Sequence, residues 1–190
     1  MPLCVLKKPE FNVSALPTSQ QLFAFLDETH RRIDAQVQRL AQLVDTLSER
    51  EWTAAERQDA QQLCDFFETE ARQHHLDEER HIFPELLTSA DASVVQATHR
   101  LTQDHGWLEE NWIEIYPHLQ ALSQSSGSYD EAELRHAVDV FKALYEEHMQ
   151  LEESLAYPQA RQMAHRLDVL GAGREMAQRR FKAERLAQAV

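Results

Sequence analysis

Apolar residues recur every three or four positions along four long stretches of the chain, which is the spacing of one face of an α-helix. The first stretch follows Pro17, Thr18 and Ser19, a typical helix start, and the second follows Thr53, which can cap a helix. The stretches predict helices over 19–48, 53–87, 91–122 and from 130 onwards. Each is long enough to cross a small domain.

Glycine, serine and proline predict where these helices end. The clearest linker covers residues 123–128, where Gly127 lies inside a serine cluster. We expect Pro158 to kink the fourth helix rather than end it. Gly171 and Gly173 are expected to break the pattern, and residues 174–189 then form a short fifth helix.

Composition agrees with a helical protein. The 190 residues include 23 Leu and 23 Ala but only 10 Val, 4 Ile and 4 Gly, a bias toward helix formers. Four helices joined by short connections predict an all-α fold, an up-down-up-down four-helix bundle. We expect an N-terminal extension at 1–18, the bundle at 19–166 and a basic C-terminal helical tail at 167–190.

The charge is negative and uneven. The net formal charge is −13, and residues 1–160 alone carry −17 because the last 30 residues are basic. Such a body repels a phosphate backbone, which argues against nucleic acid as a partner. The basic tail is expected to pack on this acidic body as a helix rather than to contact lipid or nucleic acid. No apolar run approaches the roughly 18 residues of a membrane span, and residues 1–11 lack the apolar region of an export signal, so we expect a cytoplasmic protein without membrane contact.

Histidine is unusually frequent. The chain has 10 His but only 2 Cys, too few for a disulfide framework or a four-thiolate zinc site. Many histidines in an acidic body are typical of a site for a hard or borderline cation. Any metal ion here must therefore be held by histidines and carboxylates.

The chain also repeats itself at an offset of 74 to 75 residues. The identical pairs in the second helix of each half are Phe67 and Phe141, His74 and His148, Glu78 and Glu152, Glu79 and Glu153, and Pro84 and Pro158. The preceding helices match as well, and His30 aligns with His105. The bundle is therefore predicted to be built from two repeated helical hairpins.

This repeat supplies six candidate metal ligands, which are His30, His74, Glu78, His105, His148 and Glu152. Residues i and i+4 lie about 40° apart around a helix, so each His-x-x-x-Glu presents an imidazole and a carboxylate to one point. A carboxylate can bridge two ions, so two glutamates among four histidines predict a pair of metal ions. The alternative, a buried polar network without a cation, would cost several kcal/mol for each unpaired charge.

The arrangement resembles the hemerythrin family, in its duplicated His-His-Glu cation-binding form. HHLDEERHIFP at 74–84 and EHMQLEESLAYP at 147–158 are similar to that family's HxxxEE-plus-proline signature, and GREMAQRR at 173–180 is similar to a tail in bacterial members. The resemblance covers roughly residues 20 to 165. It implies a non-haem di-iron centre, with functions that range over O2 binding, sensing of O2, NO or redox state, and iron or nitrosative-stress chemistry.

One departure from the family concerns a nitrogen ligand. Hemerythrins proper have a further histidine one turn before the third-helix ligand, where this chain has Leu101. The absence of this further histidine argues against the function of a dedicated oxygen carrier. His81 lies on the same face as His74, and it either supplies the missing nitrogen or orients Glu78.

The doublet of His74 and His75 offers two choices of ligand. The repeat selects His74, because it aligns with His148 at the offset that also aligns Glu78 with Glu152. His75 is turned by about 100° from His74, so we expect His75 and Glu79 to face solvent. Replacing His75 with Ala is then expected to change little.

Three further side chains have two interpretations each. Asp34 and Glu109 follow His30 and His105 by four residues, so they either accept hydrogen bonds from these imidazoles or line the polar edges of their helices. Tyr145 is expected to point inward, as a packed aromatic ring or as a hydrogen-bond donor near a bound gas.

Two functions fit these observations. The first is a hemerythrin-like protein whose two iron ions bind O2, NO or peroxide for sensing, storage or redox and iron-stress chemistry. Zinc or manganese can take the same ligands. The second is a metal-stabilised helical interaction module without turnover. No residue is assigned a catalytic role, and a homodimer is compatible with either function.

Overall fold

The computed structural model describes residues 18–48, 51–125 and 129–187, and every regular element in these ranges is helical. The α-helices are α1 (Ser19–Asp45), α2 (Ala54–Phe66), α3 (Arg72–His81), α4 (Phe83–Leu86), α5 (Ala92–Gln124), α6 (Glu131–Leu151), α7 (Tyr157–Gln162) and α8 (Val169–Ala187). Two π-helical segments, η2 (Phe67–Ala71) and η3 (Glu152–Ala156), join α2 to α3 and α6 to α7. Short 3₁₀ turns, η1 (Thr46–Ser48) and η4 (Ala164–Arg166), follow α1 and α7.

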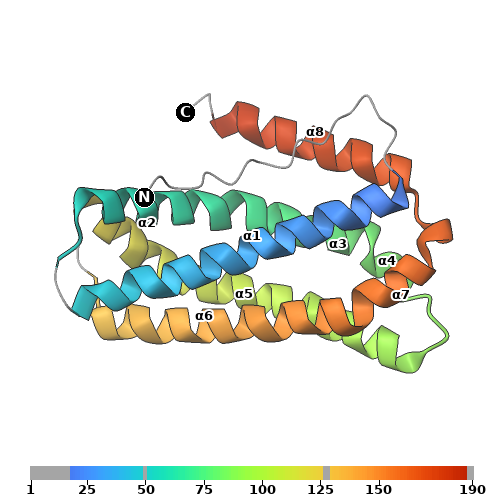
Figure 1. The fold of residues 1–190 in the computed structure, drawn as a ribbon, viewed down its shortest axis with the longest axis horizontal. Helices are drawn as coiled ribbons and strands as arrows, with labels where there is room; N and C mark the ends of the chain where they lie inside the picture. The colour runs from blue at the N-terminus through green and yellow to red at the C-terminus, as the bar shows by residue number, and fades with distance from the viewer. Residues whose placement is uncertain (1–17, 49–50, 126–128, 188–190) are drawn as a thin grey trace.

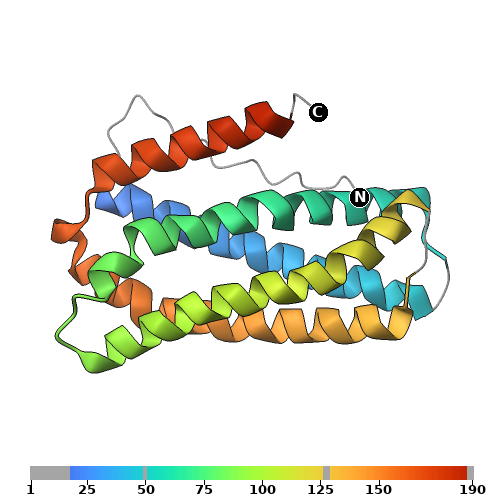
Figure 2. The ribbon, with the colours of Figure 1, turned by 180° about the vertical axis from the view of Figure 1, so that it is seen from behind.

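These elements form four long rods that lie side by side and run in alternating directions (Figure 1). The rods are α1, then α2 to α4, then α5, then α6 with α7. Helix α1 packs against α6, α2 packs against α5, and α5 packs against α6, as the view from behind also shows (Figure 2). The predicted all-α class is confirmed, and the arrangement is compatible with an up-down-up-down bundle. No helix in the described ranges combines the length and apolar content that a membrane crossing requires.

The helix starts follow the predicted capping signals. Thr18 and Thr53 each accept a hydrogen bond from the backbone N–H three residues on, and Gln21 and Glu56 complete a capping box in return. The predicted break at Gly171 and Gly173 is wrong, because both residues lie inside α8. The chain instead breaks just before α8, where the Asp168 carboxylate accepts a hydrogen bond from the Gly171 N–H at 2.9 Å. A Cβ at Gly171 would lie 2.1 Å from Asp168 Oδ2, so glycine lets this cap close over the first turn.

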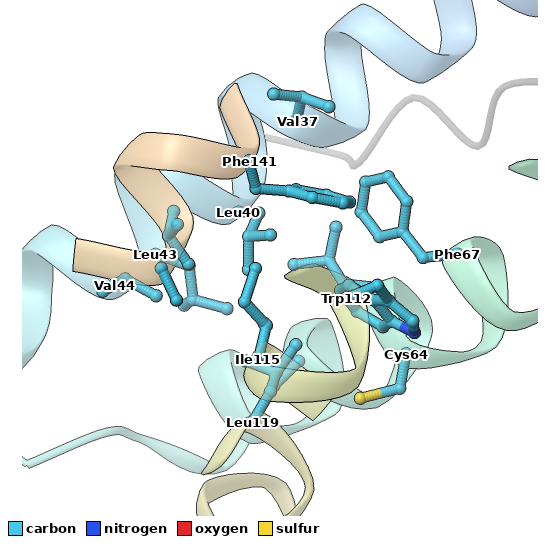
Figure 3. Close-up of a cluster of buried hydrophobic side chains, with 14 of the residues drawn as sticks. Val37, Leu40, Leu43, Val44, Cys64, Phe67, Trp112, Ile115, Leu119 and Phe141 are labelled. Carbon is cyan, nitrogen blue, oxygen red and sulfur yellow. The ribbon is translucent and has the colours of Figure 1, made fainter. Parts of the chain in front are cut away.

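The apolar core is divided into two clusters. The first includes Val37, Phe67, Trp112 and Phe141 (Figure 3), and the second includes Leu22, Leu26, Ile82 and Leu101.

Between the two clusters the same rods carry polar side chains. On α1, His30 lies between Leu26 of the second cluster and Ile33 of the first, and on α5 His105 follows Leu101 in the same way. The fold thus places a polar layer inside an otherwise apolar interior, shielded from water at both ends. Each hydrophobic cluster contributes burial energy to hold that layer together.

Helix α8 packs back on the body, as predicted for the basic tail. Ala172 and Met176 are buried in the second cluster. Asp77 on α3 is 1% exposed, and it accepts hydrogen bonds from Arg179, at 2.6 Å, and from Arg180. The buried carboxylate is therefore stabilised by two guanidinium groups of α8.

Removal of both guanidinium groups is expected to release α8. The double variant Arg179→Ala/Arg180→Ala leaves the Asp77 carboxylate buried without a cation, so we expect a loss of about 3 kcal/mol in unfolding free energy. The rate of hydrogen exchange of the α8 amides should rise by the factor that corresponds to this loss of free energy. Arg174→Ala/Lys182→Ala removes the same charge from exposed positions of α8 and serves as the control. Equal effects of the two double variants would contradict the role of Asp77.

Candidate metal centre

All six predicted ligands lie in the polar layer, and each is at most 5% exposed. They come from four rods: His30 from α1, His74 and Glu78 from α3, His105 from α5, His148 from α6, and Glu152 from the start of η3. The structure therefore brings together the residues that the repeat selected.

The six residues form two overlapping groups. We call His30, His74, Glu78 and Glu152 the first position, and Glu78, His105, His148 and Glu152 the second position. Within each group one potential ligand atom of every residue lies within 4.8 Å of the others. Both glutamates belong to both groups, so the geometry suits two neighbouring ions rather than one.

Each glutamate divides its two oxygens between the two positions. Glu152 Oε2 lies 3.1 Å from His30 Nε2, and Glu152 Oε1 lies 3.3 Å from His148 Nε2. Glu78 Oε1 faces His74 Nε2 at 3.4 Å, while Glu78 Oε2 faces His105 Nε2 at 3.5 Å. This is the orientation that bridging carboxylates require.

Several atoms in this layer lack the hydrogen bonds that buried polar groups normally make. Both ring nitrogens of His74, both oxygens of Glu152 and Glu78 Oε2 are buried and have no hydrogen bond to any described residue. Leaving such groups unpaired is costly, and natural proteins rarely do so without an ion or water. Imidazole nitrogens and carboxylate oxygens are ligands that iron, zinc and manganese accept. The residues present therefore fit a pair of transition-metal ions.

Without metal ions, charge in the layer is balanced by protons. Burial alone would lower the pKa of His30, but the neighbouring carboxylates of Glu152 and Glu78 raise it to about 10. Burial opposes the rise at His148 as well, where the charge of Glu152 and the nearby Asp104 carboxylate raise the pKa to about 10. Burial lowers the pKa of His74 to about 4, so His74 is neutral. Two imidazolium groups thus compensate the two buried carboxylates.

Two further glutamates orient the histidines of α1 and α5. His30 Nδ1 lies 3.2 Å from Glu153, and His105 Nδ1 lies 2.7 Å from Glu79. An imidazole that donates Nδ1–H to a carboxylate keeps the lone pair of Nε2 free for a metal ion. Both glutamates are the second Glu of an HxxxEE segment, and each reaches the histidine of the other hairpin.

Of the two interpretations of Asp34 and Glu109, the structure supports the polar edge of each helix rather than an orienting role. Asp34 is exposed and accepts a hydrogen bond from Gln38, while Glu109 forms an ion pair with Arg72 at 2.9 Å. His81 also points elsewhere, because its Nε2 lies 2.8 Å from Glu175 of α8, and it belongs to neither position. In the described residues His81 therefore ties α3 to α8.

His75 does not face solvent, which corrects the prediction made from its angle. Its ring stacks on His105 with the ring centres 4.0 Å apart, and its Nε2 is buried. Helix α3 contacts two neighbouring rods, so its buried face is wider than 100°. His74 faces His30 on α1, with ring centres 4.8 Å apart, while His75 faces α5. The buried Met149, which aligns with His75 in the repeat, was a signal that this position points inward.

Tyr157 is a site residue that sequence reasoning missed. Its hydroxyl lies 3.0 Å from His30 Nε2 and donates a hydrogen bond to Glu78 Oε1, and its ring stacks on His30. Burial and the charges of Glu78 and Glu152 raise the pKa of Tyr157 well above its usual value, so the phenol keeps its proton. Tyr145 points inward as predicted and is a packed aromatic residue against Phe67 and Phe141.

Two hollows adjoin the polar layer. A recess of about 20 Å³ is lined in part by Phe67, His75, Phe141 and Tyr145, which is room for about one water-sized molecule. A larger surface groove of about 520 Å³ is lined in part by His30, Asp34, Glu146 and Glu153. Its acidic walls lead to His30 of the first position.

Fold and site together define an all-helical protein with a cluster suited to cations. Residues 21–186 match the model of the Hemerythrin HHE cation binding domain. An uncharacterized protein of Haemophilus influenzae is 30% identical over 127 residues, which cover 66% of this chain and 71% of that protein. The chain therefore belongs to the hemerythrin family of HHE cation-binding domains.

Proposed function

We propose that this protein holds two metal ions, iron in its working form, inside a four-helix bundle, and that it binds O2, NO or peroxide there for sensing, storage or redox chemistry. The observation that carries the proposal is the buried set of four histidines and two shared glutamates. Membership of a cation-binding family supports it.

The residues of the polar layer would have different roles in holding the two ions. His30 and His74 would hold the ion of the first position, His105 and His148 that of the second, and the two shared glutamates would bridge them. Glu153 and Glu79 hold His30 and His105 in the tautomer that ligation needs. A pair of iron ions would supply electrons and open coordination sites for a small oxidant or gas.

The size of the recess supports a small ligand. The hollow beside His75 and Tyr145 has a volume of about 20 Å³ and a partly aromatic lining that also includes Arg72 and Glu109, and this size suits a diatomic molecule or peroxide better than a larger organic substrate. The same walls would keep bulk water from the polar layer.

Loading with iron under anaerobic conditions tests the proposal. We expect two iron ions per chain and a new near-ultraviolet and visible absorption when O2, NO or peroxide is added. A protein that binds two ions but shows no spectral change with any of the three would favour a metal-stabilised interaction module. The proposal fails if iron, zinc and manganese all remain near zero per chain.

A further inference from the structure

The two metal positions are related by the repeat but differ in their surroundings. At the first position Tyr157 places a hydroxyl group beside His30 and Glu78. The residue that aligns with Tyr157 is Phe83, whose ring stacks on His105 with the ring centres 5.5 Å apart. Phe83 has no polar side-chain atom, so the second position lacks the oxygen that Tyr157 gives the first.

Near the second position, His75 offers a nitrogen atom that has no counterpart at the first position. Its ring lies nearly parallel to that of His105, and its ring centre is 5.8 Å from that of His148. One nitrogen from each of His75, His105 and His148 lies within 4.8 Å of the other two. The residue that aligns with His75 is Met149, which offers no nitrogen near the first position.

A purely structural role does not explain the buried nitrogen of His75. Its Nε2 makes no hydrogen bond to any described residue, although burying an unpaired polar atom is unfavourable. An apolar ring would fill the same space between His105 and Tyr145 without that cost.

We propose that the His75 ring turns out of its stack on His105, because an ion must lie in the plane of each ring that ligates it, and becomes a metal ligand of the second position. The second position then has three imidazoles and two carboxylates. The first position keeps two imidazoles and two carboxylates, with the Tyr157 phenol beside it. The inference rests on the proposed pair of metal ions. It makes the two positions chemically unequal, and the nitrogen-rich second position should favour later first-row ions such as Co²⁺ and Zn²⁺.

Titration with Co²⁺ against a competing chelator tests the assignment, with visible absorption as the readout. The variants are His75→Ala, His75→Phe, which keeps a ring stacked on His105, and His99→Ala, which removes an exposed imidazole. Wild type and His99→Ala should bind two ions per chain. Both His75 variants should bind one ion as wild type does and the other about 100-fold more weakly, because a lost ligand costs at least as much as a lost orienting residue. Free imidazole should restore the second ion and its absorption in His75→Ala, whereas pyrrole, which has no free lone pair, should not.

The outcomes separate this inference from the proposed function. If wild type fails to bind two ions, the proposed pair of ions is wrong. If wild type binds two ions and both His75 variants match it, only the role of His75 is wrong. Equal weakening of both ions, or equal rescue by pyrrole and imidazole, would also overturn the assignment to the second position.

Discussion

Divalent metal ions are expected to raise the melting temperature of the chelator-treated protein by about 8 to 16 °C for the first tightly bound ion. An ion that binds only the folded state stabilises it by about 4 kcal/mol at a free concentration of 1,000 times its Kd. For a chain of about this size, 1 kcal/mol corresponds to about 2 to 4 °C. The second ion should add to the shift. Calorimetry with Zn²⁺ and with a chelator measures it.

Variants of the proposed ligands identify which residues the metal-dependent stabilisation depends on. Glu152→Gln should lose most of the metal-dependent shift, because Glu152 faces histidines of both positions. His74→Ala should lower metal content and the shift together. Glu146→Gln removes an exposed carboxylate from the same rod and should behave as wild type. A shift of equal size in Glu152→Gln and wild type would show that the ions stabilise the protein elsewhere.

The internal repeat explains why the six central residues could be found from the sequence. Residues that share one face of a helix and recur at a constant offset are placed by local geometry alone. His74 and Glu78 on one hairpin, and His148 and Glu152 on the other, satisfy both conditions. The structure accordingly buries all of them in one layer.

Residues that act across the hairpins could not be found in the same way. Glu79 reaches His105, and Glu153 reaches His30, from rods whose relative rotation the sequence does not state. Counting four residues along the same helix pointed to Asp34 and Glu109 instead. The angular argument failed for His75 because a rod with two neighbours buries more than one stripe.

The π-helical segments add a local reason. η2 ends three residues before His74, and η3 begins at Glu152. A π-helical turn contains one extra residue. The direction of a side chain around the helix axis, counted at 100° per residue, is therefore inaccurate beyond such a turn. Positions counted from Phe67 to the doublet, or from His148 to Tyr157, therefore carry an angular error. Tyr157 follows η3, so such a count would not place it reliably, although its alignment with the aromatic Phe83 marked it as inward.

Protons and metal ions compete for the same histidines, which gives the protein opposite pH dependences with and without metal. In the metal-free state the pKa of His30 and of His148 is about 10, against 6.5 for an ordinary histidine. Their contribution to stability is fully present below pH 6.5 and is lost as the pH rises toward 10. Burial and the charge of Glu152 oppose ionisation of Glu78, but His74 and the neighbouring rings of His105 and His30 lower its pKa from 4.5 to about 2. Its contribution is present above pH 4.5 and is lost as the pH falls toward 2.

Burial lowers the pKa of His74 to about 4, so its contribution is lost as the pH falls below 6.5, and the metal-free protein should be most stable in a narrow range around pH 6.5. Above that range we expect its unfolding free energy to fall by about 1 to 3 kcal/mol per pH unit, since two histidines release protons on unfolding. Metal binding releases the same two protons, so metal affinity should rise by up to about 100-fold per pH unit over this range. Chemical denaturation between pH 6 and 9, with chelator and with Zn²⁺, should give curves that diverge as the pH rises. Calorimetric titration in two buffers of different ionisation enthalpy counts the released protons directly, and a count near zero, or metal-free stability that does not change between pH 6 and 9, would contradict the charge balance assigned to His30 and His148.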